Sequence, residues 1–137
     1  YLFFMSFTSC FCKNLLKSIG KEIYTDNENN LNIATAISGS GPAYVFLMIE
    51  CLTESGVKLG LNYDISLELA IQTVFGAGKL ALLSNISPKE LRKNVTSPGG
   101  TTEAGIKSML KNRLDQSIIE GVKVAFEKSI ELGNKEK

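Results

Sequence analysis

The sequence contains no histidine and no tryptophan. The absence of histidine excludes Ser-His-Asp and Cys-His catalytic sites, HExxH zinc sites and c-type haem attachment. Any chemistry must therefore use carboxylates, hydroxyls, lysine, tyrosine, cysteine or backbone N–H groups, or belong to a bound cofactor or substrate.

Cysteine is also scarce: the chain holds three, Cys10, Cys12 and Cys51. An odd, sparse set forms no disulfide framework and is typical of a protein in the reducing cytoplasm. Cys-x-Cys alone is a weak metal signal. Glu50 and Glu54 lie one helical turn apart, but with Lys58 a further turn away they indicate a charged face or a subunit contact. We predict no metal site.

The chain has no surplus of charge, since 15 basic and 14 acidic residues leave a net charge of +1. This balance lacks the basic excess of a general nucleic-acid-binding protein. Apolar residues make up 44% of the chain, which excludes the composition of a disordered protein. A length of 137 residues is enough for one domain with a core of its own.

Residues 1–12 are nearly all apolar or hydroxyl-bearing. They lack the positive flank and small-residue cleavage site of a signal peptide, and they are shorter than the roughly 20 residues that span a bilayer. The chain opens on Tyr1 rather than Met, so we expect the cut end of a longer domain. A targeting segment and a membrane-attached helical protein are alternatives that depend on these residues alone.

Hydrophobic spacing and capping residues predict an almost entirely helical chain after one short strand. Asp26–Asn32 is the polar segment most typical of a linker, and Ser40 or Gly41 is the expected cap of the first long helix. The expected elements are a helix at 11–19 ended by Gly20, a strand at 21–25, and helices at 42–59 ended by Gly60, 65–84 capped by Asp64, 88–94 with a Ser87–Glu90 capping box, 101–111, and 115–132 followed by Gly133.

Residues 43–49 (AYVFLMI) are apolar on every side of the first long helix. A helix of this kind must be buried on every side, which a small helical domain cannot do with its own residues. We therefore expect a partner subunit to cover it, because it would otherwise form a large exposed apolar patch. The GxGxxA pattern at 76–81 falls inside a predicted helix, whereas a dinucleotide fingerprint follows a strand, so we reject it as a cofactor motif.

The most unusual segment is Val95–Glu103 (VTSPGGTTE). Gly99 and Gly100 permit backbone geometries closed to other residues, and they lead into a helix N-terminus, where free N–H groups attract an anion. Thr101 and Thr102 add hydroxyls. The segment is therefore either a cradle for a phosphate or carboxylate, or simply a capped turn between helices.

Three segments together, AISGSGPAY at 36–44, ESGVKLGL at 54–61 and VTSPGGTT at 95–102, resemble the C-terminal half of pyrroline-5-carboxylate reductases over residues 13–133. The resemblance implies an all-α helical bundle of the type found at the C-terminus of 6-phosphogluconate dehydrogenase, interlocked with a second subunit. It implies that residues 1–30 are the last helix and strand of a Rossmann domain followed by a linker. Residues 31–137 would then be the dimerisation and substrate-binding domain.

The implied activity is the last step of proline biosynthesis, the NAD(P)H-dependent reduction of Δ1-pyrroline-5-carboxylate to L-proline. Thr102 would be the catalytic residue, through a hydrogen bond from its hydroxyl to the ring nitrogen. The segment near the nicotinamide would be Ser38, Gly39, Gly41 and Pro42, and the substrate-binding residues would be Ser97, Pro98, Gly99, Gly100, Thr101 and Thr102. An iminium carbon is already electrophilic, so this reaction suits a chain without histidine.

The Rossmann fingerprint of that family is absent from the sequence. We therefore expect that this chain alone binds no NAD(P)H. Activity would require a cofactor domain, either one lost through truncation or one supplied by a separately encoded chain. The alternative is a catalytically inactive dimerisation module left by a decayed or truncated gene. The expected protein is a cytoplasmic homodimer or larger homo-oligomer that binds pyrroline-5-carboxylate or proline, with no nucleic-acid or membrane partner.

Overall fold

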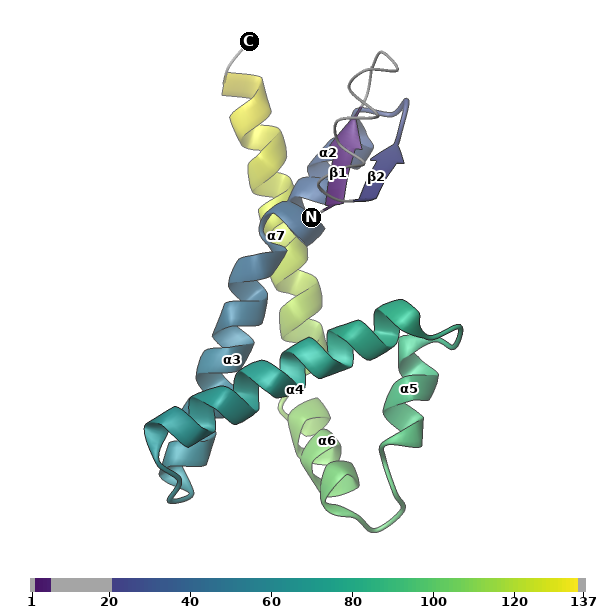
Figure 1. The fold of residues 1–137 in the computed structure, drawn as a ribbon. Helices are drawn as coiled ribbons and strands as arrows, with labels where there is room; N and C mark the ends of the chain where they lie inside the picture. The colour runs from purple at the N-terminus through teal and green to yellow at the C-terminus, as the bar shows by residue number, and fades with distance from the viewer. Residues whose placement is uncertain (1, 6–20, 136–137) are drawn as a thin grey trace. The chain divides into compact units, whose positions relative to one another are not determined.

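A computed structural model of the chain describes residues 2–5 and 21–135 (Figure 1). The helix expected at 11–19, Cys10 and Cys12 lie outside these residues. Helices account for most of the described chain, which confirms the all-α expectation. The elements are β1 Leu2–Met5, β2 Lys21–Tyr24, α2 Asn29–Ala34, the π-helical η1 Thr35–Gly39, α3 Gly41–Lys58, α4 Tyr63–Leu83, α5 Pro88–Asn94, α6 Thr101–Lys111 and α7 Leu114–Lys135.

The chain divides into two compact units, one formed by 1–42 with 118–137 and the other by 43–117. In the first unit β1 and β2 pair in parallel, with Leu2 opposite Lys21 and Met5 opposite Tyr24. The strand at β2 was expected, whereas β1 was not. Parallel neighbours need a crossover of about a dozen residues or more, and the separation of β1 and β2 along the chain is long enough.

The polar segment after β2, which was predicted to be a linker or domain boundary, contains the start of a helix. The buried Thr25 hydroxyl accepts hydrogen bonds from the Asn27 N–H at 3.2 Å and the Asn30 side-chain amide at 2.8 Å. The Asn27 side chain in turn accepts from the N–H of Asn29 at 3.0 Å. These short polar side chains satisfy backbone and amide groups near the helix entrance, so α2 begins at Asn29, inside the predicted linker.

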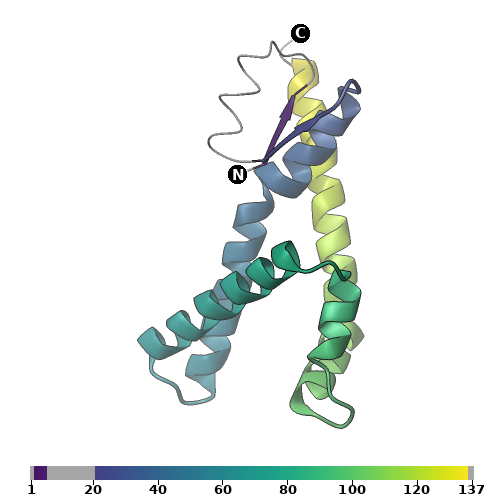
Figure 2. The ribbon, with the colours of Figure 1, turned by 45° about the vertical axis from the view of Figure 1, so that its right-hand side comes forward.

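The segment before Pro42 also differs from the expected capped entrance. The helical backbone runs from α2 through η1, where the Ser40 N–H donates to the carbonyl of Thr35 at 2.8 Å, and α3 follows at Gly41 (Figure 2). The backbone at Ser40 is itself helical, so it does not cap a new helix. Pro42 has no N–H and its ring crowds the carbonyl four residues earlier, which explains a local change of helical register here.

The last helix, α7, extends three residues beyond the expected end and includes Gly133, so the prediction that Gly133 lies past the helix was wrong. Glu131 forms ion pairs with Lys128 at 2.8 Å and with Lys135 at 2.6 Å, and pairs at this spacing stabilise a helix. In the first unit the Ser129 hydroxyl donates to the side-chain oxygen of Asn32 at 2.8 Å, which joins α7 to α2.

The second unit begins with a helical hairpin of α3 and α4. Gly60, with φ of +104°, ends α3 as expected, and the N–H groups of Gly60 and Leu61 donate to the carbonyls of Val57 and Gly56. The cap of α4 is Asn62 rather than Asp64: the Asn62 side chain accepts from the Asp64 N–H at 2.8 Å. Asp64 therefore lies within the first turn, where its charge still favours the helix.

The two helices of the hairpin approach closely at Gly56 and Ser66. A Cβ on Gly56 would lie 2.5 Å from the Ser66 Oγ and 3.0 Å from its Cβ. Ser66 is buried and its hydroxyl has no hydrogen-bond partner among the described residues. Small residues are therefore required at this crossing.

We predict that Gly56→Ala lowers the free energy of unfolding by about 1–3 kcal/mol, because the added methyl group overpacks the crossing. Gly133→Ala is the matched control, since nothing lies within 4 Å of its Cβ position. The control should be neutral or stabilising by up to about 1 kcal/mol. Urea titration of both variants measures the effect, and an unchanged midpoint for Gly56→Ala would contradict the close approach.

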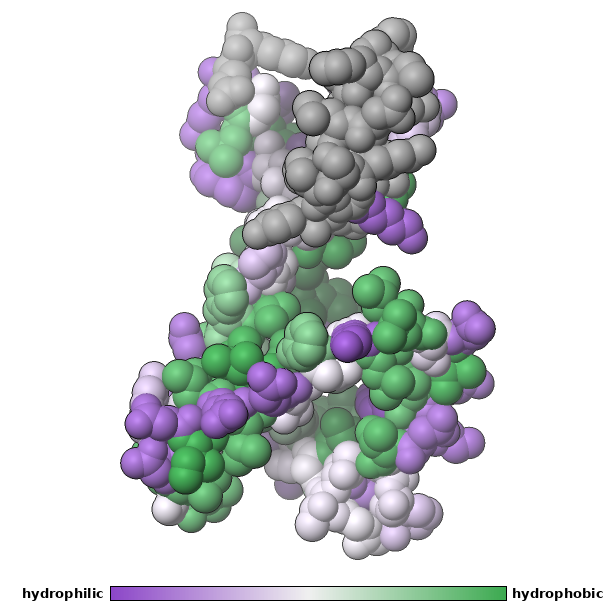
Figure 3. Space-filling view, in the orientation of Figure 1, coloured by the Kyte–Doolittle hydropathy of each residue, from purple (hydrophilic) through white to green (hydrophobic). Residues whose placement is uncertain are grey.

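Among the described residues, the six that are buried are all small or polar: Thr25, Ala34, Ala36, Thr53, Ser66 and Ala70. Large apolar side chains remain exposed along the helices, and Figure 3 shows them as green surface patches. Phe46 and Leu47 are 62% and 60% exposed, as expected for the apolar segment 43–49. Asn29–Lys58 and Tyr63–Leu83 are long and apolar enough to cross a membrane, a property shared by core helices of soluble proteins.

Candidate functional site

The candidate site begins at α5, whose capping box confirms the sequence expectation. The Glu90 N–H donates to the Ser87 hydroxyl at 3.3 Å, and the Ser87 N–H donates to the Glu90 carboxylate at 3.2 Å. Pro88 occupies the first turn, where no N–H is needed. Reciprocal capping defines the start of α5, the short helix that directly precedes Val95–Glu103.

Ser97–Gly100 is a tight turn. The Gly100 N–H donates to the Ser97 carbonyl at 3.0 Å, Pro98 is the second residue of the turn, and Gly99 is the third with φ of +72°. This is the pattern of a type II turn, in which proline presets one position and glycine adopts the left-handed one. Gly100 is constrained too, because a Cβ there would lie 3.1 Å from the Ser97 carbonyl oxygen.

The turn leads directly into the N-terminus of α6. Gly100 occupies the N-cap position with extended backbone, and no side chain caps the helix there. The N–H groups of Thr101, Thr102 and Glu103 therefore remain free in this described segment, at the positive end of the helix dipole. Both threonines are exposed. The geometry is suited to a carboxylate or phosphate.

Glu103 holds the turn from the first turn of α6. One of its carboxylate oxygens accepts from the Gly99 N–H at 2.8 Å, and the other pairs with Lys107 at 3.0 Å. The Gly99 hydrogen bond, followed by Lys107, lowers the pKa of Glu103 from its ordinary value of 4.5. Because folding favours the charged form of Glu103, these contacts stabilise the folded chain at neutral pH. The stabilisation is lost as the pH falls through the lowered pKa of Glu103.

We predict that Gly99→Ala destabilises the turn by about 1–2 kcal/mol, because an L side chain is strained at this positive φ. Gly105→Ala in α6 is the matched control, since its Cβ position has no neighbour within 4 Å. Thermal unfolding compares the two variants. An equal or higher midpoint for Gly99→Ala than for Gly105→Ala would contradict the turn geometry.

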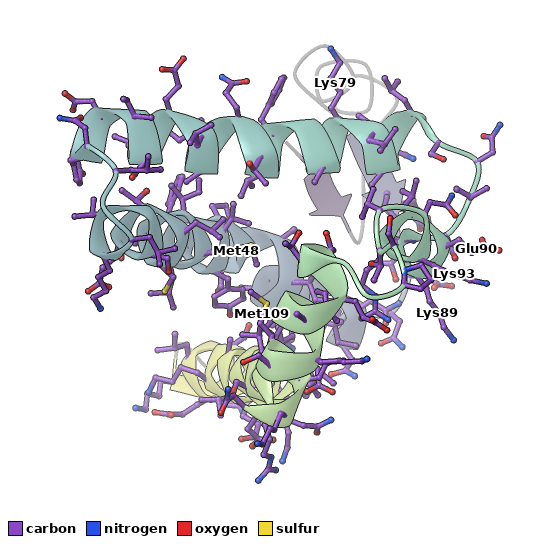
Figure 4. All side chains as sticks on the ribbon, turned by 90° about the horizontal axis from the view of Figure 1, so that it is seen from below. Met48, Lys79, Lys89, Glu90, Lys93 and Met109 are labelled. Carbon is purple, nitrogen blue, oxygen red and sulfur yellow. The ribbon has the colours of Figure 1, made fainter. Side chains whose placement is uncertain are left out.

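An open cavity of about 660 Å³ lies beside this loop rather than in it. Its lining is Ser87, Lys89, Glu90, Arg92, Lys93, Thr96 and Ile106, so none of the six predicted substrate-binding residues contributes. Figure 4 shows Lys89, Glu90 and Lys93 projecting from α5. The same view shows Lys79 projecting from α4 on the side away from α3, and its ammonium lies 5.8 Å from the Phe75 ring centre.

The residues predicted to lie near a nicotinamide fall in the first unit, around η1. Ser38 and Gly39 belong to the π-helical turn, and the Ser38 hydroxyl donates to the Ala34 carbonyl at 3.0 Å. Gly41 and Pro42 form the start of α3. A π-helical turn of this kind is common at functional sites. Within 2–5 and 21–135 no cluster of histidine, cysteine or carboxylate side chains could hold a metal ion.

Comparison with known proteins decides the family. The model of the pyrroline-5-carboxylate reductase dimerisation family matches residues 28–132. The chain belongs to the pyrroline-5-carboxylate reductase family. The GxGxxA pattern at 76–81 lies inside α4, as expected, and so is no cofactor fingerprint of this family member.

Curated pyrroline-5-carboxylate reductases support this assignment. The Pseudomonas aeruginosa enzyme is 43% identical over 118 residues, which cover 86% of this chain and 43% of that protein. The pea enzyme (Pisum sativum) is 44% identical over 118 residues, with coverage of 86% and 43%. The chain thus spans less than half the length of these two relatives.

Solved structures of the family agree in fold. The Coxiella burnetii pyrroline-5-carboxylate reductase superposes with a TM-score of 0.85 at 38% identity. The match covers 96% of this chain and 50% of the Coxiella chain. A Plasmodium falciparum pyrroline carboxylate reductase with NADP bound has a TM-score of 0.82 at 36% identity, covering 93% and 51%. The matched part of the reductase fold therefore reaches beyond the dimerisation segment.

Sequence reasoning missed one residue of the loop, Glu103. Its contact with Gly99 could have been anticipated from spacing, because a carboxylate four residues after a turn N–H can fold back to accept from it, as in a capping box. The expectation for Thr101 and Thr102 as ligand-binding hydroxyls stays a prediction. The structure places them adjacent to the turn with no capping role.

Proposed function

We propose that this chain is the substrate-binding and dimerisation part of an NAD(P)H-dependent reductase that converts Δ1-pyrroline-5-carboxylate to L-proline. The observation that carries the proposal is the type II turn at Ser97–Gly100 leading into an uncapped helix N-terminus. It occurs in a chain that belongs to the reductase family.

The loop would hold the substrate's carboxylate. Free N–H groups at a helix N-terminus bind an anion without any lysine or arginine, which agrees with the composition of residues 95–103. Ser97, Pro98, Gly99 and Gly100 would shape the turn, and Thr101 and Thr102 would offer their N–H groups. The Thr102 hydroxyl would hydrogen-bond the ring nitrogen and thereby orient the C=N carbon.

NAD(P)H supplies the hydride for this chemistry. Ser38, Gly39, Gly41 and Pro42 would lie against the nicotinamide, where the small side chains at η1 allow close approach. Residues 1–30 would be the end of a dinucleotide-binding domain, which is supported by the parallel pairing of β1 with β2. Residues 31–137 would form the dimerisation and substrate domain. We do not expect NAD(P)H to bind this chain without the rest of a cofactor domain.

The partner would be a second copy of the chain, in a homodimer or larger homo-oligomer. The matched family is described as a dimerisation domain. The exposed apolar side chains of α3 and α4 would be buried against the second copy. We assign these faces to protein rather than lipid, and we propose a cytoplasmic protein. The alternative is an inactive dimerisation module, which would assemble in the same way.

Two measurements test the proposal. L-proline titrated into the isotopically labelled chain should shift the backbone amide signals of Thr101 and Thr102, and the absence of any shift would contradict a carboxylate site. Reduction of pyrroline-5-carboxylate with NADPH is then assayed with and without a dinucleotide-binding domain. Turnover only with that domain supports the proposal, turnover without it contradicts the need for one, and binding without turnover in either case indicates the inactive module.

A further inference from the structure

Glu103 makes two contacts that use its two carboxylate oxygens separately. Oε2 accepts from the Gly99 N–H at 2.8 Å, and Oε1 pairs with the Lys107 ammonium at 3.0 Å. The Glu103 side chain is one-third exposed, whereas that of Lys107 is 72% exposed. The carboxylate therefore bridges the turn before α6 to the second turn of α6.

We propose that Glu103 is a positioning residue that locks the Ser97–Gly100 turn, and that Lys107 cancels its charge beside the anion site. The proposal rests on the carboxylate-binding function proposed for this loop.

The lock follows from the hydrogen bonds of the turn. The Gly100 N–H donates to the Ser97 carbonyl, and the Gly99 N–H donates to the Glu103 carboxylate. With both N–H groups held inside the loop, the donors left for a ligand are those of Thr101 and Thr102, together with the N–H of Glu103 itself. A turn held at both glycines presents these donors in one geometry, which reduces the ordering needed when a ligand binds.

The role of Lys107 follows from charge. A bare carboxylate in the first turn of α6 would repel an incoming carboxylate at the same helix end, and two unit charges a few ångströms apart interact appreciably even in water. Lys107, one helical turn further along, offsets that charge. The pair thus permits a negatively charged side chain to organise a site for a negatively charged ligand.

The lock is tested in the free chain, without any ligand. Hydrogen exchange of the Gly99 amide should accelerate about tenfold in Glu103→Ala, because the charge-assisted hydrogen bond is lost. Glu103→Gln keeps an acceptor of the same shape and should accelerate exchange much less. Unchanged Gly99 exchange in Glu103→Ala would overturn the lock. Lys123→Gln, which changes a lysine of α7 that also pairs with glutamate, is the control and should leave Gly99 unaffected.

The charge cancellation is tested by L-proline affinity at low salt. Lys107→Gln should weaken binding about fivefold by exposing the charge of Glu103, and the double variant Glu103→Gln with Lys107→Gln should restore most of the affinity. A single Lys107→Gln variant that binds as well as the native chain would overturn the role of Lys107. Tighter binding by Glu103→Ala would also overturn the proposal, because it would show Glu103 competing with the ligand.

The two tests separate this inference from the function on which it rests. If the native chain binds no L-proline, the carboxylate site and the role of Lys107 are both overturned. The Gly99 exchange experiment still decides whether Glu103 locks the turn, since it needs no ligand.

Discussion

Replacing Thr102 with alanine is expected to lower the kcat of a reductase assembled with this chain by about 10²-fold or more. The proposed role of the Thr102 hydroxyl is to hydrogen-bond the substrate ring nitrogen, so its removal misplaces the C=N carbon relative to the hydride. The loop itself should survive the change, because the Thr102 side chain is exposed and caps no backbone group. Stopped-flow measurement of NADPH oxidation gives the rate.

Two further variants at Thr102 separate chemistry from shape. Thr102→Ser keeps the hydroxyl and should retain most of the activity, whereas Thr102→Val keeps the shape and should be as slow as alanine. Amide exchange across the Ser97–Gly100 turn should be the same in all three variants. A near-normal rate for Thr102→Ala or Thr102→Val would remove the hydroxyl from the mechanism.

Placing a charge in the exposed apolar segment of α3 should have an effect of similar size on assembly. Phe46→Asp or Leu47→Asp is expected to raise the dimer dissociation constant at least 100-fold, because each replaces a large apolar side chain with a carboxylate that the interface would desolvate. Both positions are about three-fifths exposed in the single chain. Light scattering over a dilution series measures the change.

The control for this experiment is Lys89→Gln on α5, an exposed position with no ion pair in the described chain. It should leave the dissociation constant within about twofold, since isolated surface charges contribute little. A native chain that is already a stable monomer, with its apolar helix faces in water, would contradict the proposed role of α3.

Local signals predicted much of the fold. The end of α3 at Gly60 and the capping box of α5 depend on residues within a few positions of each other, and both were predicted correctly. Two of the errors concern the ends of helices. Asn62 rather than Asp64 caps α4, and ion pairs of Glu131 accompany the continuation of α7 beyond Gly133.

The π-helical turn before Pro42 was not predicted, because proline indicates a helix start whether the chain before it is extended or already helical. Glu103 was missed for a related reason. From the sequence alone, Glu103 could either be a favourable charge in the first turn of α6 or accept a hydrogen bond from the preceding turn. Distances to Gly99 and Lys107 distinguish the two.

The sequence by itself determined the helical class and the reductase family, because the helical periodicity and the three family segments can be read from it directly. It left open whether Val95–Glu103 is an anion cradle or a turn between helices. Only the tertiary structure revealed that Gly56 must be small, since its neighbour Ser66 lies across a helical hairpin. The same holds for the pairing of Asn32 with Ser129, which are 97 residues apart. The sequence of an apolar run does not show whether its own chain or another chain covers it. The structure adds that Phe46 and Leu47 of α3 are exposed in the single chain.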